Sequence, residues 1–227
     1  MNKRLGYTRT CAVIPMKDLA VAKQRLSGML SIGERRHLSL EMLLDVITTL
    51  KRVDGLDAVA VISRDPHVMD LARTWNVRVL RDTESCMNAA LAVTARTLST
   101  EGCETMLVVP GDVPLTTPAE IEKILETRDT GFPVTLVPDR RRTGTNALSC
   151  SPPTAITPCF GQHSLMRHQK AAKDAGLTST VLELPELGLD IDVPEDVFAL
   201  RARKGQSRTH DFLEAMPART LHHGEPR

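Results

Sequence analysis

The segment MLVVPGDVPL, residues 106–115, joins an unbroken apolar run to a Pro-Gly-Asp turn. Apolar runs without alternation are typical of strands that are covered on both faces. The turn brings one carboxylate, Asp112, to the carboxyl end of such a strand. In α/β sheets, ligands bind outside the carboxyl ends of the strands. The segment therefore predicts a buried strand that ends at a functional residue.

Short apolar runs alternate with helical patterns on both sides of this segment. Strands are expected at residues 11–16, 58–62, 77–80, 106–109, 132–137, around 147–148, 180–184 and 189–193. Helices are expected at residues 34–53, 66–75, 87–98, from 118, 163–175, from 194 and 210–216, with Asp65 and Thr117 as caps. The first helix has one apolar face, formed by Leu43, Val46, Ile47 and Leu50. This alternation predicts an α/β fold with a doubly wound, mainly parallel sheet.

Composition restricts the classes of protein to which the chain can belong. Its 227 residues fit a single domain, expected over residues 1–203, with a charged tail over residues 204–227. A net charge of +1 and an aromatic content of 3% argue against a nucleic-acid partner. We find no run of bilayer length, no secretory signal and no Cys-x-x-Cys pair among the five cysteines. We therefore expect a cytoplasmic protein without a membrane partner.

A basic loop follows the first strand. It carries Lys17, Lys23 and Arg25 just past the expected carboxyl end of that strand. Cations there suit a triphosphate, because they neutralise the charge that moves to a leaving pyrophosphate. The alternative is a solvated basic loop. No Gly-x-x-x-x-Gly-Lys phosphate loop is present, which argues against ordinary ATPase chemistry.

A second acidic segment, LDIDVPED, lies near the end of the chain. Residues i and i+2 of a strand point the same way, so Asp190 and Asp192 are expected to share a face, with Ile191 buried on the other. Two like charges at that spacing are unfavourable without a nearby cation. Together with Asp112 they predict a site for Mg²⁺, which prefers oxygen ligands. The alternative is that the pair is a solvated strand end and Asp112 starts a turn.

Two further segments carry groups suited to anions. Residues 143–146, Thr-Gly-Thr-Asn, offer hydroxyls, an amide and a glycine that lets the backbone approach an anion, and the arginine run 140–142 adds positive potential. Residues 160–164, Phe-Gly-Gln-His-Ser, precede a helix whose amino end suits phosphate or carboxylate. Each alone is also typical of an ordinary turn or cap. Trp75, the seven histidines and the cysteines form no triad-like spacing, so we assign them core or surface roles.

Seven motifs, taken in order over residues 11–199, resemble those of a known family. They are VIPMKDLAVAKQRL, SIGERRHLSLEMLLDV, MNAAL, VVPGDVPL, TGTNAL, FGQHS and LDIDVPED. The chain resembles the guanylyltransferases of deazaflavin coenzyme biosynthesis, which include 2-phospho-L-lactate guanylyltransferase and phosphoenolpyruvate guanylyltransferase. That resemblance implies the nucleotidyltransferase fold, of glycosyltransferase-A-like type.

The resemblance also implies a reaction and a set of roles. GTP would transfer its guanylyl group to a small phosphorylated acid, with Mg²⁺ as cofactor and release of pyrophosphate. The acceptor phosphate is already ionised at neutral pH, so positioning and charge neutralisation would carry the catalysis. The implied catalytic residues are Lys17, Lys23 and Arg25, the implied substrate-binding residues are Asn88, Thr145, Gly161 and Ser164, and the implied metal ligands are Asp112, Asp190 and Asp192.

Some positions depart from the family pattern. Gly111 and Val113 stand where alanine and leucine are frequent, and Cys86-Met87 stands where glycine and leucine are frequent. We expect the last pair near the acceptor, and we rank 3-phospho-D-glycerate and phosphoenolpyruvate ahead of 2-phospho-L-lactate. The alternatives are a related enzyme that uses another nucleotide or a sugar phosphate, and an inactive nucleotide-binding regulator. A homodimer is left open, because the sequence does not determine the oligomeric state.

Overall fold

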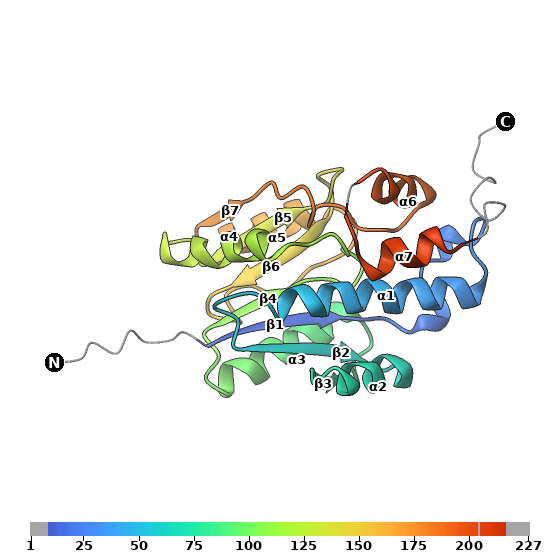
Figure 1. Cartoon of the computed structure of the whole chain (residues 1–227). Helices are drawn as coiled ribbons and strands as arrows, with labels where there is room; N and C mark the ends of the chain where they lie inside the picture. Colours follow the sequence, from blue (N-terminus) through green and yellow to red (C-terminus); the bar gives the residue numbers. More distant parts are fainter. Residues whose placement is uncertain (1–8, 204, 217–227) are drawn as a thin grey trace.

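A seven-stranded sheet forms the centre of the molecule (Figure 1). The computed structural model describes residues 9–203 and 205–216. The strands are β1 (Thr10–Pro15), β2 (Ala58–Ser63), β3 (Arg78–Arg81), β4 (Thr105–Val108), β5 (Val134–Pro138), β6 (Thr145–Cys150) and β7 (Ser179–Val181). The helices are α1 (Ile32–Leu50), α2 (Pro66–Thr74), α3 (Met87–Thr100), α4 (Pro118–Asp129), α5 (Ser164–Asp174), α6 (Pro194–Arg201) and α7 (Arg208–Glu214), with the short 3₁₀ turns η1 (Leu19–Val21) and η2 (Gln24–Leu26).

The spatial order of the strands is β3-β2-β1-β4-β6-β5-β7. All neighbouring strands are parallel except β6, which runs antiparallel to both β4 and β5. The predicted doubly wound, mainly parallel sheet is therefore confirmed. The reversed direction of β6 was not predicted from the sequence, and it decides which residues reach the site described below.

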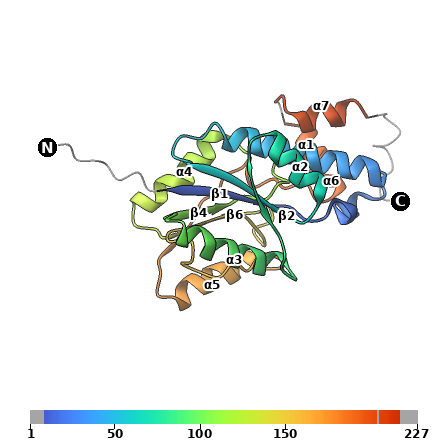
Figure 2. The ribbon, with the colours of Figure 1, turned by 90° about the horizontal axis from the view of Figure 1, so that it is seen from below.

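The alternation of side chains along the strands produces two cores, one on each face of the sheet. In β1, Ala12 and Ile14 pack into one core, whereas Cys11 and Val13 pack into the other. Helices α1, α2 and α4 cover the first face and helices α3 and α5 cover the second, as Figure 2 shows. Both faces of the central strands are thus buried, as the unbroken apolar run in β4 predicts.

Local capping determines where several helices begin. Ser31 and Glu34 form a capping box at the start of α1, so that helix begins two residues before its predicted start. Asp65 caps α2 and Thr117 caps α4, each followed by proline, as predicted. The second oxygen of Asp65 accepts the Leu19 N–H at 2.9 Å, so this cap also holds the loop after β1.

The strand predicted at residues 189–193 is absent from the described sheet, so that prediction is wrong. The Ile191 N–H donates to the carbonyl oxygen of Asp112 at 3.0 Å, and no strand pairing forms around this contact. A turn at Gly188, whose N–H donates to Leu184 O, directs the chain across the end of β4 rather than alongside a strand. The predicted strand at 180–184 is likewise shorter, and ends at Val181.

A third apolar cluster joins the segment 26–30, α1, α6 and α7. Within the segment expected as a charged tail, α7 packs along α1 (Figure 1), and its Leu213 is fully buried in this cluster. Residues 204 and 217–227 of that tail lie outside the described residues. No helix of the described chain combines the length and the apolar character that crossing a bilayer requires.

Asp45 of α1 holds the start of α7, and its removal should destabilise the protein. Its carboxylate accepts the N–H groups of Arg208 and Thr209 at 3.0 and 2.9 Å and the Thr209 hydroxyl at 2.6 Å. We expect Asp45→Ala to lower the free energy of unfolding by about 1–3 kcal/mol, because buried donors lose their acceptor. Urea denaturation measures this, with the exposed Asp54→Ala as control. Equal stability of the two variants would contradict the assignment.

Candidate active site

An open pocket of about 520 Å³ lies at one edge of the sheet. The segments after β1 and β4 line it, together with the first residues of β6. The implied catalytic, substrate-binding and metal-binding residues all lie in its lining except Asn88: Lys17, Lys23, Arg25, Asp112, Thr145, Gly161, Ser164, Asp190 and Asp192.

Sheet topology explains why these segments meet. The chain leaves β1 to one side, towards β2, and returns to its other side at β4, so the order of the strands reverses between them. Such a reversal leaves a crevice at the carboxyl ends of the strands. Because β6 is antiparallel to β4, its amino end, which carries Thr145 and Asn146, lies at the same edge.

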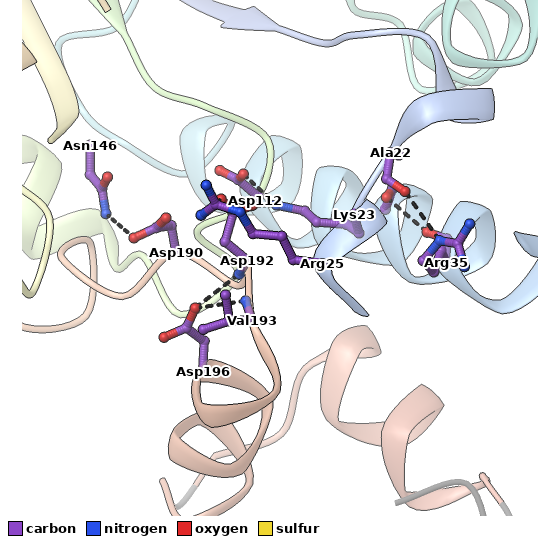
Figure 3. A network of polar contacts seen from close by, with 11 residues as sticks. Ala22, Lys23, Arg25, Arg35, Asp112, Asn146, Asp190, Asp192, Val193 and Asp196 are labelled. Atoms are coloured by element: carbon purple, nitrogen blue, oxygen red, sulfur yellow. Dashed lines mark hydrogen bonds and ion pairs between the residues drawn. The ribbon is translucent and has the colours of Figure 1, made fainter. Parts of the chain in front are cut away.

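The Lys23 ammonium group lies between two carboxylates in this pocket (Figure 3). Its Nζ is 2.6 Å from Asp112 Oδ2 and 2.9 Å from Asp192 Oδ1, and the side chain is only 8% exposed. Burial alone would lower the pKa of Lys23, but the two carboxylates raise it above its usual value. Burial alone would raise the pKa of Asp192, but Lys23 and then Arg25 hold it below its usual value. Lys23 and Asp192 are therefore both charged at neutral pH.

The loop that carries Lys23 is held in place by α1. The guanidinium of Arg35, which is buried, donates to Ala22 O at 3.4 Å and to Leu30 O at 2.8 Å. Lys23 itself adopts a left-handed backbone conformation, with φ of 51°. Lys17 and Arg25 lie on the same loop but are exposed, and Arg25 approaches Asp192 only to 3.8 Å.

Asp190 lines the same pocket, and Figure 3 shows it beside Asn146. Its Oδ1 accepts the Asn146 side-chain amide at 3.2 Å, and the same amide donates to Leu187 O at 3.1 Å. Burial and then the charge of Asp112 raise the pKa of Asp190 to about 6. Asn146 belongs to the Thr-Gly-Thr-Asn motif, and no separate role was predicted for it from the sequence.

A network of backbone contacts orients the segment that carries Asp192. Asp196 accepts the N–H groups of Asp192 and Val193, both at 3.0 Å, and its other oxygen accepts Arg140 at 3.0 Å. Asp190 and Asp192 both line the pocket while Ile191 is fully buried, so the predicted alternation holds without a strand.

The arginine run 140–142 was expected to add positive potential to the site, and the structure does not place it in the pocket lining. Arg140 pairs with Asp196, and Arg142 pairs with Glu183. Lys17, Lys23 and Arg25 are the cationic side chains that line the pocket.

Asn88 supports the pocket from outside its lining. Its side-chain oxygen accepts Phe160 N–H at 2.8 Å, and its amide donates to Phe160 O at 3.0 Å. The neighbouring Met87, in contrast, lines the pocket, whereas Cys86 does not. Asn88 therefore holds the segment that leads to Gly161.

The three aspartates supply oxygen donors of the kind that Mg²⁺ prefers. Magnesium is commonly held by one or two carboxylates together with waters and substrate phosphates, so a closed protein cage is not required. Within the described residues, no three His, Cys, Asp or Glu side chains converge closely enough to hold a metal ion by themselves. Lys23 occupies the space between two of the carboxylates instead. The oxygen donors that line the pocket are therefore of the kind that fits Mg²⁺.

Comparison with known proteins identifies the family. The family model for guanylyl transferases of the CofC-like type matches residues 10–221. The chain belongs to this family.

Several curated relatives are similar over most of their length. A phosphoenolpyruvate guanylyltransferase of Rubrobacter xylanophilus is 39% identical, covering 86% of this chain and 94% of the relative. The phosphoenolpyruvate guanylyltransferase of Conexibacter woesei is 35% identical, and the match covers 91% of this chain and 96% of the relative. A 3-phospho-D-glycerate guanylyltransferase of Colwellia psychrerythraea is 32% identical, covering 83% and 90%.

Solved structures share the fold at low identity. A nucleotide-diphospho-sugar transferase-like protein of Desulfovibrio desulfuricans G20 superimposes with a TM-score of 0.75 at 13% identity, covering 90% of this chain and 94% of that one. The 4-diphosphocytidyl-2C-methyl-D-erythritol synthase of Anaerococcus prevotii gives a TM-score of 0.60 at 11% identity, covering 92% and 99%. The predicted nucleotidyltransferase fold is confirmed.

Removal of the Lys23 charge should reduce stability in a pH-dependent way. We expect Lys23→Met to lower the free energy of unfolding at pH 7 by about 1–3 kcal/mol, less than a fully buried pair would lose, because solvent reaches Asp112 and Asp192. The pKa of Asp192 is lower in the folded state than in the unfolded state. Its contribution to folding stability is therefore fully present above the pKa of the unfolded state and is lost as the pH falls through the pKa of the folded state. The difference from wild type should therefore shrink below about pH 4.

Urea denaturation at a series of pH values measures this difference. Lys17→Met, which removes an exposed charge from the same loop, is the matched control. A destabilisation by Lys23→Met that is constant from pH 7 to pH 3 would show that the ion pairs do not cause it.

Proposed function

We propose that this protein is a guanylyltransferase that joins GTP to a phosphorylated three-carbon acid and releases pyrophosphate. The observation that carries the proposal is the arrangement of Lys23 with Asp112 and Asp192, at the switch point of a nucleotidyltransferase sheet. The names of the relatives support both the guanylyl group and the class of acceptor.

The proposed reaction forms one bond and breaks one. An oxygen of the acceptor phosphate attacks the α-phosphorus of GTP, and the bond to the β-phosphate oxygen breaks, so its electron pair leaves with pyrophosphate. The attacking oxygen is already ionised at neutral pH, and no general base is needed. Catalysis then rests on positioning and on neutralising the charge that accumulates on the leaving group.

The loop cations suit the nucleotide side of this reaction. Arg35 holds the loop backbone next to Lys23, whereas the side chains of Lys17 and Arg25 are exposed and suited to the outer phosphates. The carboxylates Asp112, Asp190 and Asp192 would hold Mg²⁺. When bound, Mg²⁺ would supply charge neutralisation at the phosphates.

The other side of the pocket suits the acceptor acid. Thr145, Gly161 and Ser164 lie there, at the amino ends of β6 and α5. A helix amino terminus and hydroxyl groups favour an anion with more than one oxygen. Phosphoenolpyruvate and 3-phospho-D-glycerate remain ranked together, ahead of 2-phospho-L-lactate, and we place the product in deazaflavin coenzyme biosynthesis.

A panel of substrates tests the proposal. Pyrophosphate release should be measured with Mg²⁺, with each of GTP, ATP, CTP and UTP, and with each of the three acids and a sugar phosphate. We expect turnover with GTP and at least one three-carbon acid, and discrimination of about tenfold for each hydrogen bond that a wrong acid fails to make. If only a sugar phosphate supports turnover, the assignment of the acceptor is wrong. If only CTP supports turnover, the assignment of the nucleotide is wrong. An absence of turnover with every pair would favour a regulator.

The carboxylates provide a second prediction. Asp112→Asn, Asp190→Asn and Asp192→Asn should each lower the rate by about a hundredfold or more, because loss of a ligand charge weakens metal binding and raises the barrier by several kcal/mol. Rates at saturating Mg²⁺ should be compared with those of Asp54→Asn, which alters an exposed site. Near-normal turnover of all three variants would rule out the metal assignment.

A further inference from the structure

His168 is a fully buried histidine immediately behind the acceptor side of the pocket. It lies on α5, and it is 0% exposed. One ring nitrogen, Nε2, is 2.9 Å from the backbone nitrogen of Cys159, and the other, Nδ1, is 3.0 Å from the hydroxyl oxygen of Thr145. The sequence predicts only a core or surface role for this histidine, and the structure adds these two contacts.

The first contact determines the tautomer of the ring. A backbone N–H can only donate, so Nε2 must accept and cannot carry a proton. Burial, and then the nearby Arg167, lower the pKa of His168 to about 4, which keeps the ring neutral at pH 7. A neutral imidazole with a bare Nε2 has its single proton on Nδ1.

The tautomer in turn determines the direction of the Thr145 hydroxyl. Because Nδ1 carries a proton, it donates to Thr145 Oγ1, and the hydroxyl accepts in that contact. The hydroxyl proton is then directed elsewhere, and Thr145 lines the pocket. A group in the pocket that meets this proton must be an acceptor, such as an oxygen of phosphate or carboxylate.

We propose that His168 is a positioning residue that makes Thr145 a hydrogen-bond donor toward an anionic oxygen of the acceptor acid. This rests on the proposed function, because it assigns the acceptor acid to the Thr145 side of the pocket. Without the imidazole donor, the Thr145 hydroxyl could turn its own proton toward the protein and present only lone pairs to the acid. A lone pair facing an anion is repulsive, so binding would weaken.

The same residue also holds the segment that leads to Gly161. The backbone N–H of Cys159 donates a hydrogen bond to His168. The next residue, Phe160, forms hydrogen bonds with the Asn88 side chain through both its backbone N–H and its carbonyl. The Phe160 ring packs edge-on against the His168 ring, with centroids 4.9 Å apart. His168 thus makes two separable contacts, one to a hydroxyl and one to a loop, and two different substitutions can divide them.

Nuclear magnetic resonance tests the tautomer directly. Spectra of protein with ¹⁵N-labelled histidine, recorded at pH 7, should show one ring with a protonated Nδ1 and a bare Nε2, and this signal should be missing in His168→Asn. A protonated Nε2 on His168 would overturn the proposal. This readout needs no turnover, so it is independent of the proposed guanylyl transfer.

Kinetics test the consequence for the acceptor, with phosphoenolpyruvate and 3-phospho-D-glycerate as the probes. In His168→Asn the amide nitrogen takes the place of Nδ1 and keeps the donor to Thr145. In His168→Gln the amide oxygen takes the place of Nε2 and keeps only the contact to Cys159. We expect His168→Gln to raise the KM for the acid about tenfold, with a KM for GTP within twofold of wild type. In His168→Asn, the KM for the acid should stay much closer to the wild-type value, because the donor to Thr145 is kept.

A double-substitution cycle separates positioning from packing. If His168 acts through Thr145, His168→Gln should have no further effect on the acid KM in a Thr145→Val background. Additive effects, or equal losses in His168→Gln and His168→Asn, would assign His168 a purely structural role. Melting temperatures of all variants identify those that fail to fold. If the variants do not fold, the tautomer measured on the wild-type protein still tests the proposal, because a protonated Nε2 would overturn it. If the wild-type protein transfers no guanylyl group to either acid, the proposed function fails while the tautomer measurement keeps its meaning.

Discussion

The ion pairs of Lys23 with Asp112 and Asp192 are the contact on which the whole site depends. They connect the loop after β1, which carries Lys23, to the turn after β4 and to the segment before α6. Asp112 and Asp192 lie 89 and 169 residues from Lys23 along the chain. A charged group buried to this extent is costly unless it is paired, so each partner fixes the position of the others. The rest of the local structure supports this arrangement: Arg35 holds the lysine loop, and Asp196 holds the backbone of Asp192.

Charge balance supports the proposal that the pocket binds a metal–nucleotide complex. One buried lysine faces two carboxylates, and Asp190 adds a third whose pKa is raised by burial and by Asp112. The protein therefore holds more negative than positive charge at the centre, while Lys17 and Arg25 remain exposed at the rim. A divalent cation would relieve the excess at the centre, and the rim cations would meet phosphate. The proposed roles of the metal ion and of the loop cations rest on this division.

The opposite half of the pocket is built by a different principle, since neutral hydrogen bonds determine its geometry. His168 and Asn88 act from behind the lining, one on Thr145 and Cys159 and the other on Phe160. Residues of this kind need no contact with a ligand to affect it, because they determine which way a hydroxyl points and where a backbone turn lies. Selectivity between similar acids can therefore depend on residues outside the lining.

Local pattern was sufficient for much of the fold. Apolar periodicity and caps such as Asp65 and Thr117 involve residues a few positions apart, so the sequence alone located most helices and strands and the doubly wound class. Position after a predicted strand was also enough to select Lys23 and Asp112, because parallel strands bring their carboxyl ends to one edge. Other features depend on contacts between distant segments, which no local pattern records. These are the reversed direction of β6, the crossing of residues 189–193 over β4 without a ladder, the pairing of Arg140 with Asp196, and the tautomer of His168, for which only the tertiary structure supplies the partners.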